Sequence, residues 1–278
     1  MNLSPGATYW KEAVVETTTE NDMFLNSEEN SNKQTTVVHY KVLSEENGKF
    51  RLKTSYDMLE LEMTAREVEA AELDDLLKIM KGLSAELKKS SFELIINSNG
   101  ELIEVIDFDA VMDAIQTFID SLVHDKRASA VKILSFLNES FFKESFESAW
   151  SFIPLEEVRI GQSWQKTLEV YKLFGMVMHY NYTLTEITED HFLIDILGDV
   201  EIDKNSSFLD LLAEMGNVDF AGDIHGKLKI DRSSGWIMEA ELFQIFDMNT
   251  KLQMPGAEEE MTMKMKSTSV SSMRGGVK

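Results

Sequence analysis

The chain contains no cysteine, only three prolines and no apolar run of the roughly 18 residues that a membrane helix needs. Without cysteine there is no disulfide framework, thiolate nucleophile or cysteine-ligated metal site. Without a long apolar run there is no candidate transmembrane segment. Residues Met1–Pro5 lack the basic and apolar regions of a signal peptide. We therefore expect either a cytoplasmic protein or an exported one whose leader is absent from this sequence.

Basic residues are also scarce. The 27 lysines and arginines face 49 acidic residues, which gives a formal charge of −22. Such a chain repels phosphate backbones and anionic headgroups, so we expect no nucleic-acid partner and no electrostatic docking on membranes. The length of 278 residues and the hydrophobic content of 43% are enough for a substantial core.

Apolar residues occupy alternate positions between Gly175 and Asp203, on both sides of a polar break at residues 188–191. In order they are Met176, Met178, Tyr180, Tyr182, Leu184, Phe192, Ile194, Ile196, Val200 and Ile202. A period of two places these side chains on one face of a strand. The segment therefore predicts a long antiparallel hairpin whose even-numbered side chains face a core.

The rest of the chain predicts further strands with helices between them. The expected strands are Thr8–Thr19, Val38–Val42, Phe50–Met63 with a bulge where its alternation changes phase, Phe92–Ile96, Leu102–Ile106, Ser163–Tyr171, Ile224–Ile230, Trp236–Met248 and Met261–Lys266. The expected helices are Arg66–Lys88, two or more within Asp107–Trp150, and Phe208–Met215. The acidic segment Glu20–Lys33 predicts a loop.

The spacing of these elements suggests an internal duplication. Tyr40 and Phe50 are separated by ten residues, as are Tyr182 and Phe192, and a glycine-containing turn precedes each first strand at Gly6 and Gly161. We therefore predict an α+β fold with two related antiparallel β units and helices packed on one face, as two sheets or one long sheet. The expected division is a first β unit at 1–107, a helical connector at 108–154, a second β unit at 155–268 and a frayed tail at 269–278.

Side chains with catalytic or metal-binding chemistry are not clustered in the sequence. The histidines His39, His124, His179, His191 and His225 lack metal-ligand spacing. Asp107, Asp109 and Asp113 lack the glycine and final glutamate of a calcium loop, and Asp107 or Asp109 is better explained as a helix cap. No phosphate-binding loop or nucleophile elbow occurs. We therefore predict no enzyme, no catalytic residue, no metal and no cofactor.

Methionine is abundant, with 16 residues, many on the apolar parity of expected strands. Methionine fills irregular gaps in an ordinary core, and it also lines adaptable apolar grooves. The second reading predicts a ligand site between sheet and helices, as in lipoprotein-carrier-like folds. Its residues would be Met176, Met178, Tyr180, Tyr182, Met261, Met263 and Met265.

Several short motifs resemble an uncharacterised family of secreted proteins and lipoproteins of Bacteroidetes-type cell envelopes. They are Gly6 with Tyr9, Pro154, Gly161–Trp164, Tyr182–Ile187, Asp231–Trp236 and the Met/Lys/Thr-rich last strand. The resemblance implies an exported protein of the periplasm, outer membrane or cell surface, whose leader and lipid-bearing cysteine are missing from this sequence. It implies no catalytic residues.

Three functions follow in order of preference. The first is a non-enzymatic envelope protein that binds an apolar ligand, a lipid or a peptide, between sheet and helices. The second is a structural or interaction protein that presents an acidic surface to a protein partner. The third is a hydrolase that uses carboxylates which the sequence does not mark.

Overall fold

The computed structural model of this protein describes residues 1–23, 26–65, 70–123, 127, 139–170, 176–203, 216–253 and 260–278. Its strands are β1 (Thr8–Met23), β2 (Asn26–Glu46), β3 (Lys49–Ala65), β4 (Phe92–Asn97), β5 (Leu102–Ile106), β6 (Ser163–Val170), β7 (Met176–Ile187), β8 (His191–Ile202), β9 (Gly216–Asp231), β10 (Ile237–Gln253) and β11 (Glu260–Val277). Its helices are α1 (Ala70–Leu87), α2 (Asp109–Ser121) and α4 (Glu139–Ala149).

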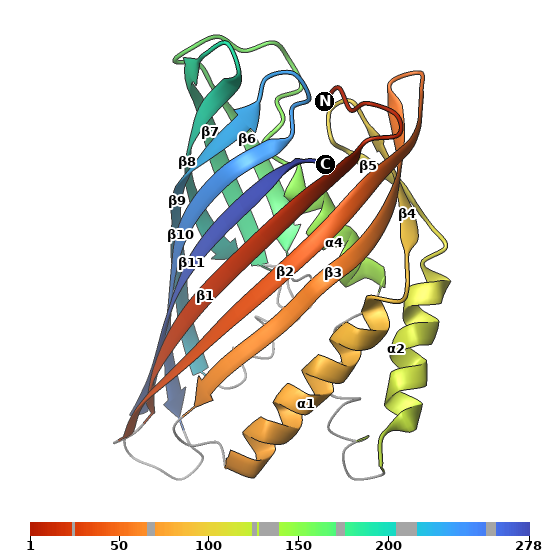
Figure 1. Ribbon diagram of the computed structural model, residues 1–278. Coiled ribbons are helices and arrows are strands. Elements are labelled where there is room, and N and C mark those ends of the chain that lie inside the picture. Colours follow the sequence, from red (N-terminus) through yellow and green to blue (C-terminus); the bar gives the residue numbers. More distant parts are fainter. Residues whose placement is uncertain are drawn as a thin grey trace.

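These strands form a single 11-stranded antiparallel sheet with the order β5-β4-β3-β2-β1-β11-β10-β9-β8-β7-β6 (Figure 1). Strands β1 and β11 pair from Tyr9 opposite Val277 to Met23 opposite Met263. This pairing joins the two halves of the chain by backbone hydrogen bonds, so the prediction of an α+β fold with two β units is wrong. The protein is mainly β with one continuous sheet. An overlay of the two halves of the sequence cannot show which edge strands pair with each other. Unpaired edge strands gain backbone hydrogen bonds when they pair.

The residue pairs behind the overlay nevertheless have the same local geometry. Gly6 and Gly161 have positive φ angles of 84° and 83°. The Gly6 amide donates to the Val42 carbonyl at 2.9 Å, and the Gly161 amide donates to the Leu184 carbonyl at 2.7 Å. A shift in strand register follows Val42 and Leu184 alike. The hydrogen-bond pattern therefore repeats within the one sheet, while the division at residues 107/108 and 154/155 stays a prediction.

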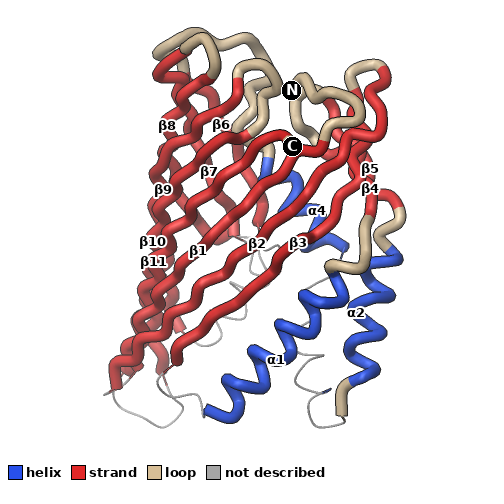
Figure 2. The backbone as a smooth tube through the Cα atoms, viewed as in Figure 1, coloured by secondary structure: helices blue, strands red, loops and turns tan. Residues whose placement is uncertain are grey.

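The sheet is strongly curved. A side chain at Gly226 of β9 would point into the hollow, and its Cβ would lie 2.2 Å from the Glu241 carbonyl oxygen of β10. Glycine at this position lets the two backbones approach more closely than any other residue allows, which bends the sheet. The result is a trough whose concave side faces the helices (Figure 2).

The helices occupy the trough. Helix α1 contacts β3 and α2, and α4 contacts both β5 and β6, which are the two edge strands of the sheet. Figure 1 shows α4 in the hollow behind β1, β2 and β3. Because α4 reaches both edges, it covers the concave face and holds the open sides of the trough together.

The core lies between this helix layer and the sheet. On β7 and β8 the buried residues fall on even positions, as the alternation predicts: Met178, Tyr182, Leu184, Ile194, Ile196, Val200 and Ile202. An aromatic cluster joins strands of both halves to the end of α4. Tyr40 and Trp236 lie 5.2 Å apart between ring centroids, and Trp150 lies 5.8 Å from Tyr40 and 6.3 Å from Trp236. Such ring pairs stabilise a core beyond their burial.

Several local predictions are confirmed. Strand β5 has the expected bounds, and β4 extends the expected strand Phe92–Ile96 by one residue. The phase change in β3 is a bulge, because Val37 faces Met58 whereas its neighbour Val38 faces Tyr56. One extra residue in β3 therefore turns Leu59 and the odd positions after it toward the inside.

Two other local predictions are wrong. The acidic segment Glu20–Lys33 is not a loop, because residues 20–23 extend β1 and residues 26–33 belong to β2. The tail is not frayed, because residues 269–277 belong to β11 and pair with β1. In both places pairing with a neighbouring strand overrides weak local strand propensity. The helix predicted at Phe208–Met215 lies outside the described residues.

Candidate functional site

A cavity of about 230 Å³ lies between α4 and the concave face of the sheet. Its walls come from β1, β7, β8, β9, β10 and β11 on one side and from α4 and the residues after it on the other. The side chains that line it are Lys11, Ser145, Ser148, Ala149, Ser151, Phe152, Tyr180, Tyr182, Ile196, Leu228, Ile237, Leu242, Gln244, Ser271 and Met273. The cavity is partly open and has a mixed polar and apolar lining.

Lys11 is the charged residue of this lining. It occupies an inward position of β1, two residues after the buried Tyr9, and it is opposite Val38 and Gly275 on the neighbouring strands. Burial lowers the pKa of its ammonium group to about 8, because fewer water molecules solvate the charge there. Within the described part of the chain no carboxylate forms an ion pair with Lys11. A cation thus faces the cavity without a counter-ion.

Other polar groups surround this lysine. The Ser151 and Tyr182 hydroxyls are hydrogen-bonded at 3.0 Å, and burial raises the pKa of the Tyr182 phenol to about 12. Ser271 lines the cavity from β11, the neighbour of β1 in the sheet, and Gln244 lines it from β10, the strand beyond β11. The cavity can therefore offer one positive charge and several hydrogen-bond donors to a bound molecule.

A second cavity of about 240 Å³ lies on the other side of Phe152. Its lining is almost entirely apolar: Met1, Phe152, Ile153, Pro154, Val158, Trp164, Leu184, Ile187, Phe192, Ile194, Ile230 and Gly235. The Trp164 indole donates a hydrogen bond to the Phe152 carbonyl at 3.1 Å, which fixes the segment that separates the two cavities. Phe152 itself is 5% exposed and borders both.

The predicted ligand residues are divided between several places. Tyr180 and Tyr182 line the 230 Å³ cavity. Met178 is buried with Val200 and Ile224 in a smaller cluster, against which Met176 packs. Met263 and Met265 lie on β11 and are partly exposed, and the side chain of Met261 lies outside what the structure describes. The structure thus brings the two tyrosines to a cavity, while the role of all seven residues stays a prediction.

Sequence reasoning missed Lys11. Its position carried a usable signal, because Tyr9, Lys11, Ala13 and Val15 share the parity of β1 that faces inward. A lysine among such residues is an exception to the rule that charged groups stay in water. Charged residues are common throughout the chain, so one lysine at an inward position did not stand out in the sequence.

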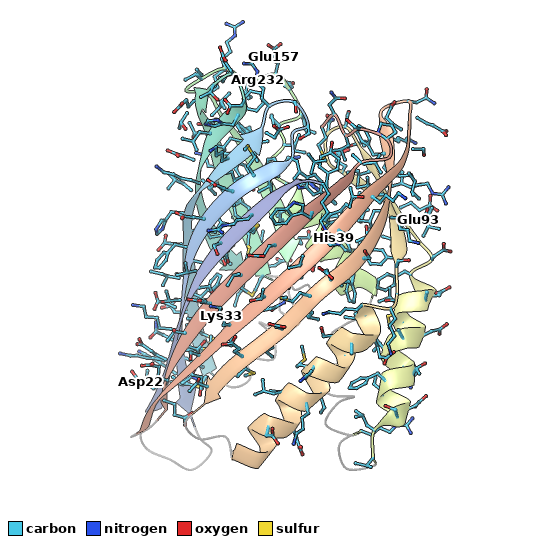
Figure 3. All side chains as sticks on the ribbon, viewed as in Figure 1. Asp22, Lys33, His39, Glu93, Glu157 and Arg232 are labelled. Atoms are coloured by element: carbon cyan, nitrogen blue, oxygen red, sulfur yellow. The ribbon has the colours of Figure 1, made fainter. Side chains whose placement is uncertain are left out.

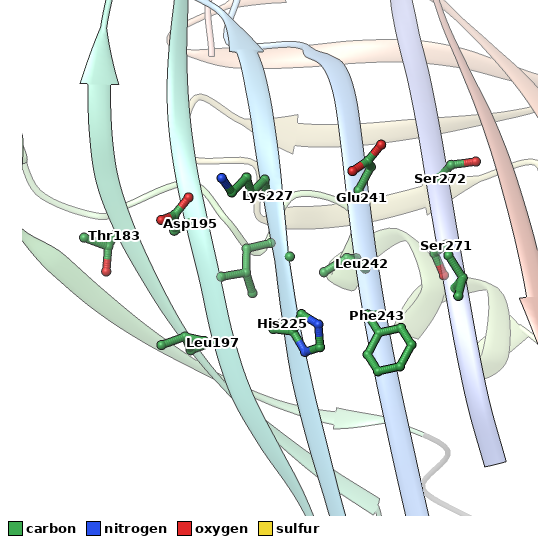
Figure 4. A pocket seen from close by; sticks show the side chains of 13 residues that line it. Thr183, Asp195, Leu197, His225, Lys227, Glu241, Leu242, Phe243, Ser271 and Ser272 are labelled. Carbon is green, nitrogen blue, oxygen red and sulfur yellow. The ribbon is translucent and has the colours of Figure 1, made fainter.

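The convex face carries a shallow groove of about 720 Å³ across β7–β11 (Figure 4). Asp195, Lys227 and Glu241 are adjacent across three strands, with Lys227 between the two acids. The next row contains Leu197, His225 and Phe243; the last two rings lie 4.7 Å apart. The arrangement is a partly apolar surface with a charged border.

The remaining histidines and aspartates have structural positions. His179 lies 3.3 Å from the Glu201 carboxylate on the next strand, and His191 bonds the Thr188 hydroxyl in the β7–β8 turn. Helix α2 starts at Asp109 with Phe108 as its N-cap and no side-chain cap, so the prediction that Asp107 or Asp109 caps it is wrong. Asp107 instead has a positive φ of 58° in the tight turn before the helix. Among the described residues no group of His, Asp and Glu is arranged to hold a metal ion.

Charged side chains extend over the whole length of the outer surface (Figure 3). Arg232 and Glu157 lie at one end of the sheet, and Asp22 lies at the other. Among the described segments no helix is both long and apolar enough to cross a lipid bilayer.

Three solved structures that align with this chain come from Pseudomonas species. An outer membrane channel from Pseudomonas putida F1 is 7% identical over 99% of this chain and 97% of that chain, with a TM-score of 0.20. OccK5 (OpdH) of Pseudomonas aeruginosa is 8% identical over 98% of this chain and 99% of that chain, with a TM-score of 0.22. OpdL of the same species is 5% identical over 97% of this chain and 99% of that chain, with a TM-score of 0.21. Scores this low carry no argument about fold or function.

No curated protein matches the chain in sequence. A family profile does match, over residues 47–237, which include β3–β9 and the helices. These residues provide α4, Phe152 and both tyrosines of the cavity, whereas Lys11 lies before them. Since the match extends over more than half of the chain, the protein belongs to the family of unknown function DUF6263.

Proposed function

We propose that this protein is a non-enzymatic carrier or binding protein of the bacterial cell envelope, which holds an apolar ligand between its curved sheet and its helices. The observation that carries the proposal is the pair of cavities of about 230 and 240 Å³ on either side of Phe152. Known ligand pockets measure about 300–1,000 Å³, so each cavity alone suits a small ligand and the two together suit a longer one.

The lining supports an amphiphilic ligand. One cavity is apolar and the other contains a cation and hydroxyl groups, so the two sides of Phe152 differ in the chemistry that they accept. Phe152 follows the end of α4 and is held by packing and by backbone contacts, such as that with Trp164. A rotation of its ring would connect the cavities without disturbing the sheet.

The envelope location rests on the resemblance of the sequence motifs to secreted proteins and lipoproteins. Cell fractionation of the source bacterium with an antibody against the protein tests it. We expect the protein in the periplasmic or membrane fractions, and recovery in the cytoplasm alone would contradict the location.

Native mass spectrometry of protein purified from cells tests ligand binding, together with titration of a fluorescent fatty acid. We expect a bound mass above that of the apo chain and saturable binding of the probe. The substitution Ser148→Phe fills the 230 Å³ cavity from α4 and should reduce binding at least tenfold. Glu147→Phe is the matched control, because Glu147 is exposed on the same helix and does not line the cavity.

The proposal is wrong if only the apo mass is found and neither variant nor wild type binds the probe. It is also wrong if both variants bind as tightly as the wild type, because the probe would then occupy another surface. Thermal unfolding of each variant shows whether the fold is retained.

A second candidate function is a structural or interaction protein with an acidic surface. The convex groove favours it, because Leu197 and Val270 are 62% and 49% exposed beside the charged row of Asp195, Lys227 and Glu241. Chemical cross-linking in cells should capture a partner at this face. Leu197→Asp should abolish that product without changing ligand binding.

A further inference from the structure

We propose that the 230 Å³ cavity binds the anionic head of a single-chain amphiphile, with Lys11 as the group that recognises a carboxylate. This inference rests on the proposed function and adds the ligand class. The cavity lies between α4 and the sheet and is partly open, so protein would cover part of a bound head.

Charge supports an anion. Among the described residues that border the cavity, Lys11 is the charged one and none is acidic. Its ammonium group makes no hydrogen bond or ion pair with any described residue. A buried cation without a partner is unfavourable, and an anionic ligand supplies the missing partner.

Hydrogen bonding supports a carboxylate. Ser271 on β11, the neighbour of β1, and Gln244 on β10, one strand further, line the same cavity, and within the described structure neither side chain makes a hydrogen bond. A carboxylate has two oxygens that accept several bonds, so it can take a bond from Lys11 and further bonds from hydroxyl or amide groups of the lining. A charge-assisted bond to the lysine is the strongest of these.

The remaining lining supports an apolar chain. Tyr180, Leu228 and Leu242 border the cavity, and Phe152 separates it from the apolar cavity near Trp164. A volume of about 230 Å³ holds about eight groups the size of a water molecule. A carboxylate with a medium-length chain therefore fits the first cavity, and a longer chain would extend past Phe152.

Isothermal titration calorimetry of the full chain at pH 7 with octanoate, 1-octanol and octylamine tests the inference. We expect octanoate to bind more tightly than octanol by about 10- to 100-fold, as for a charge-assisted hydrogen bond, and octylamine not to bind. Lys11→Met should remove the preference for octanoate and leave the affinity for octanol within about threefold of the wild type. Lys41→Met, at an exposed position of the adjacent strand β2, is the matched control and should change neither affinity.

The possible results separate the inference from the proposed function. If octanol and octanoate bind equally, or if Lys11→Met keeps the preference, the role of Lys11 is refuted while the carrier function stands. If none of the three compounds binds and the purified protein has the apo mass, both proposals are refuted. Inorganic phosphate is an additional ligand: its binding with the affinity of octanoate would indicate a free anion site without a chain.

Discussion

Replacement of Lys11 by methionine should stabilise the protein while it removes ligand recognition. Methionine is similar in length and apolar, and it fits a position between Tyr9 and Ala13 on the inward parity of β1. In the folded apo protein the lysine pays a desolvation penalty that lowers its pKa from 10.5 to about 8. The unfolded chain restores the normal pKa, so protonation favours the unfolded state.

The magnitude follows from this difference. At about 1.4 kcal/mol per pH unit, the interval between 10.5 and about 8 corresponds to about 3 kcal/mol at pH 7. Lys11 is partly exposed, so solvent screens its charge, and the expected gain for Lys11→Met is about 1–3 kcal/mol. For a chain of 278 residues this equals a rise in melting temperature of about 2–5 °C.

The stability difference between Lys11→Met and the wild type should depend on pH. Between about pH 8 and 10.5 the unfolded chain binds more protons at this site than the folded one, so the wild type gains stability relative to the variant as pH rises. The stability advantage of Lys11→Met should therefore fall at least twofold between pH 7 and pH 9.5. The free energies of unfolding of the two proteins are compared at the same pH. Any contribution from titration of the buried Tyr40 and Tyr56 is the same in both proteins and drops out of the difference.

Urea unfolding followed by circular dichroism at both pH values measures the effect, with Lys41→Met as the control. A destabilised Lys11→Met variant, or an advantage that does not change with pH, would refute the idea that this ammonium group is desolvated and unpaired. An excess of octanoate should reverse the order of stabilities at pH 7, because it stabilises only the protein that binds it.

Three further predictions concern packing and hydrogen bonds. Gly82→Ala should destabilise the protein by about 1–3 kcal/mol, because a Cβ in α1 would lie 2.2 Å from the Phe118 ring of α2; Lys81→Ala, at an exposed position of the same helix, is the control. Trp164→Phe removes the bond to the Phe152 carbonyl and should cost about 1–3 kcal/mol and loosen probe binding, seen by calorimetry. Tyr182→Phe breaks the contact with Ser151 and should cost about 1 kcal/mol, measured by urea unfolding.

Local structure was largely readable from the sequence. Alternation placed the even residues of β7 and β8 in the core, and the change of phase after Met58 located a bulge. Both follow from backbone geometry, because neighbouring side chains of a strand point to opposite faces whatever the rest of the chain does. The sequence predicted a ligand site between sheet and helices. Of the residues that line the 230 Å³ cavity, it predicted only Tyr180 and Tyr182.

By itself the sequence determined where β4, β7 and β8 lie and which of their faces turn inward, because period and parity are local properties. Only the tertiary structure decided that β1 and β11 join the halves into one sheet, since edge strands pair through backbone groups that every residue shares. It also decided that residues 20–23 and 26–33 of the acidic segment are strand and that Lys11 faces a cavity between the sheet and α4. A lysine is costly in such a place only because α4 reaches both edges of the trough, and that contact comes from residues more than 100 positions away.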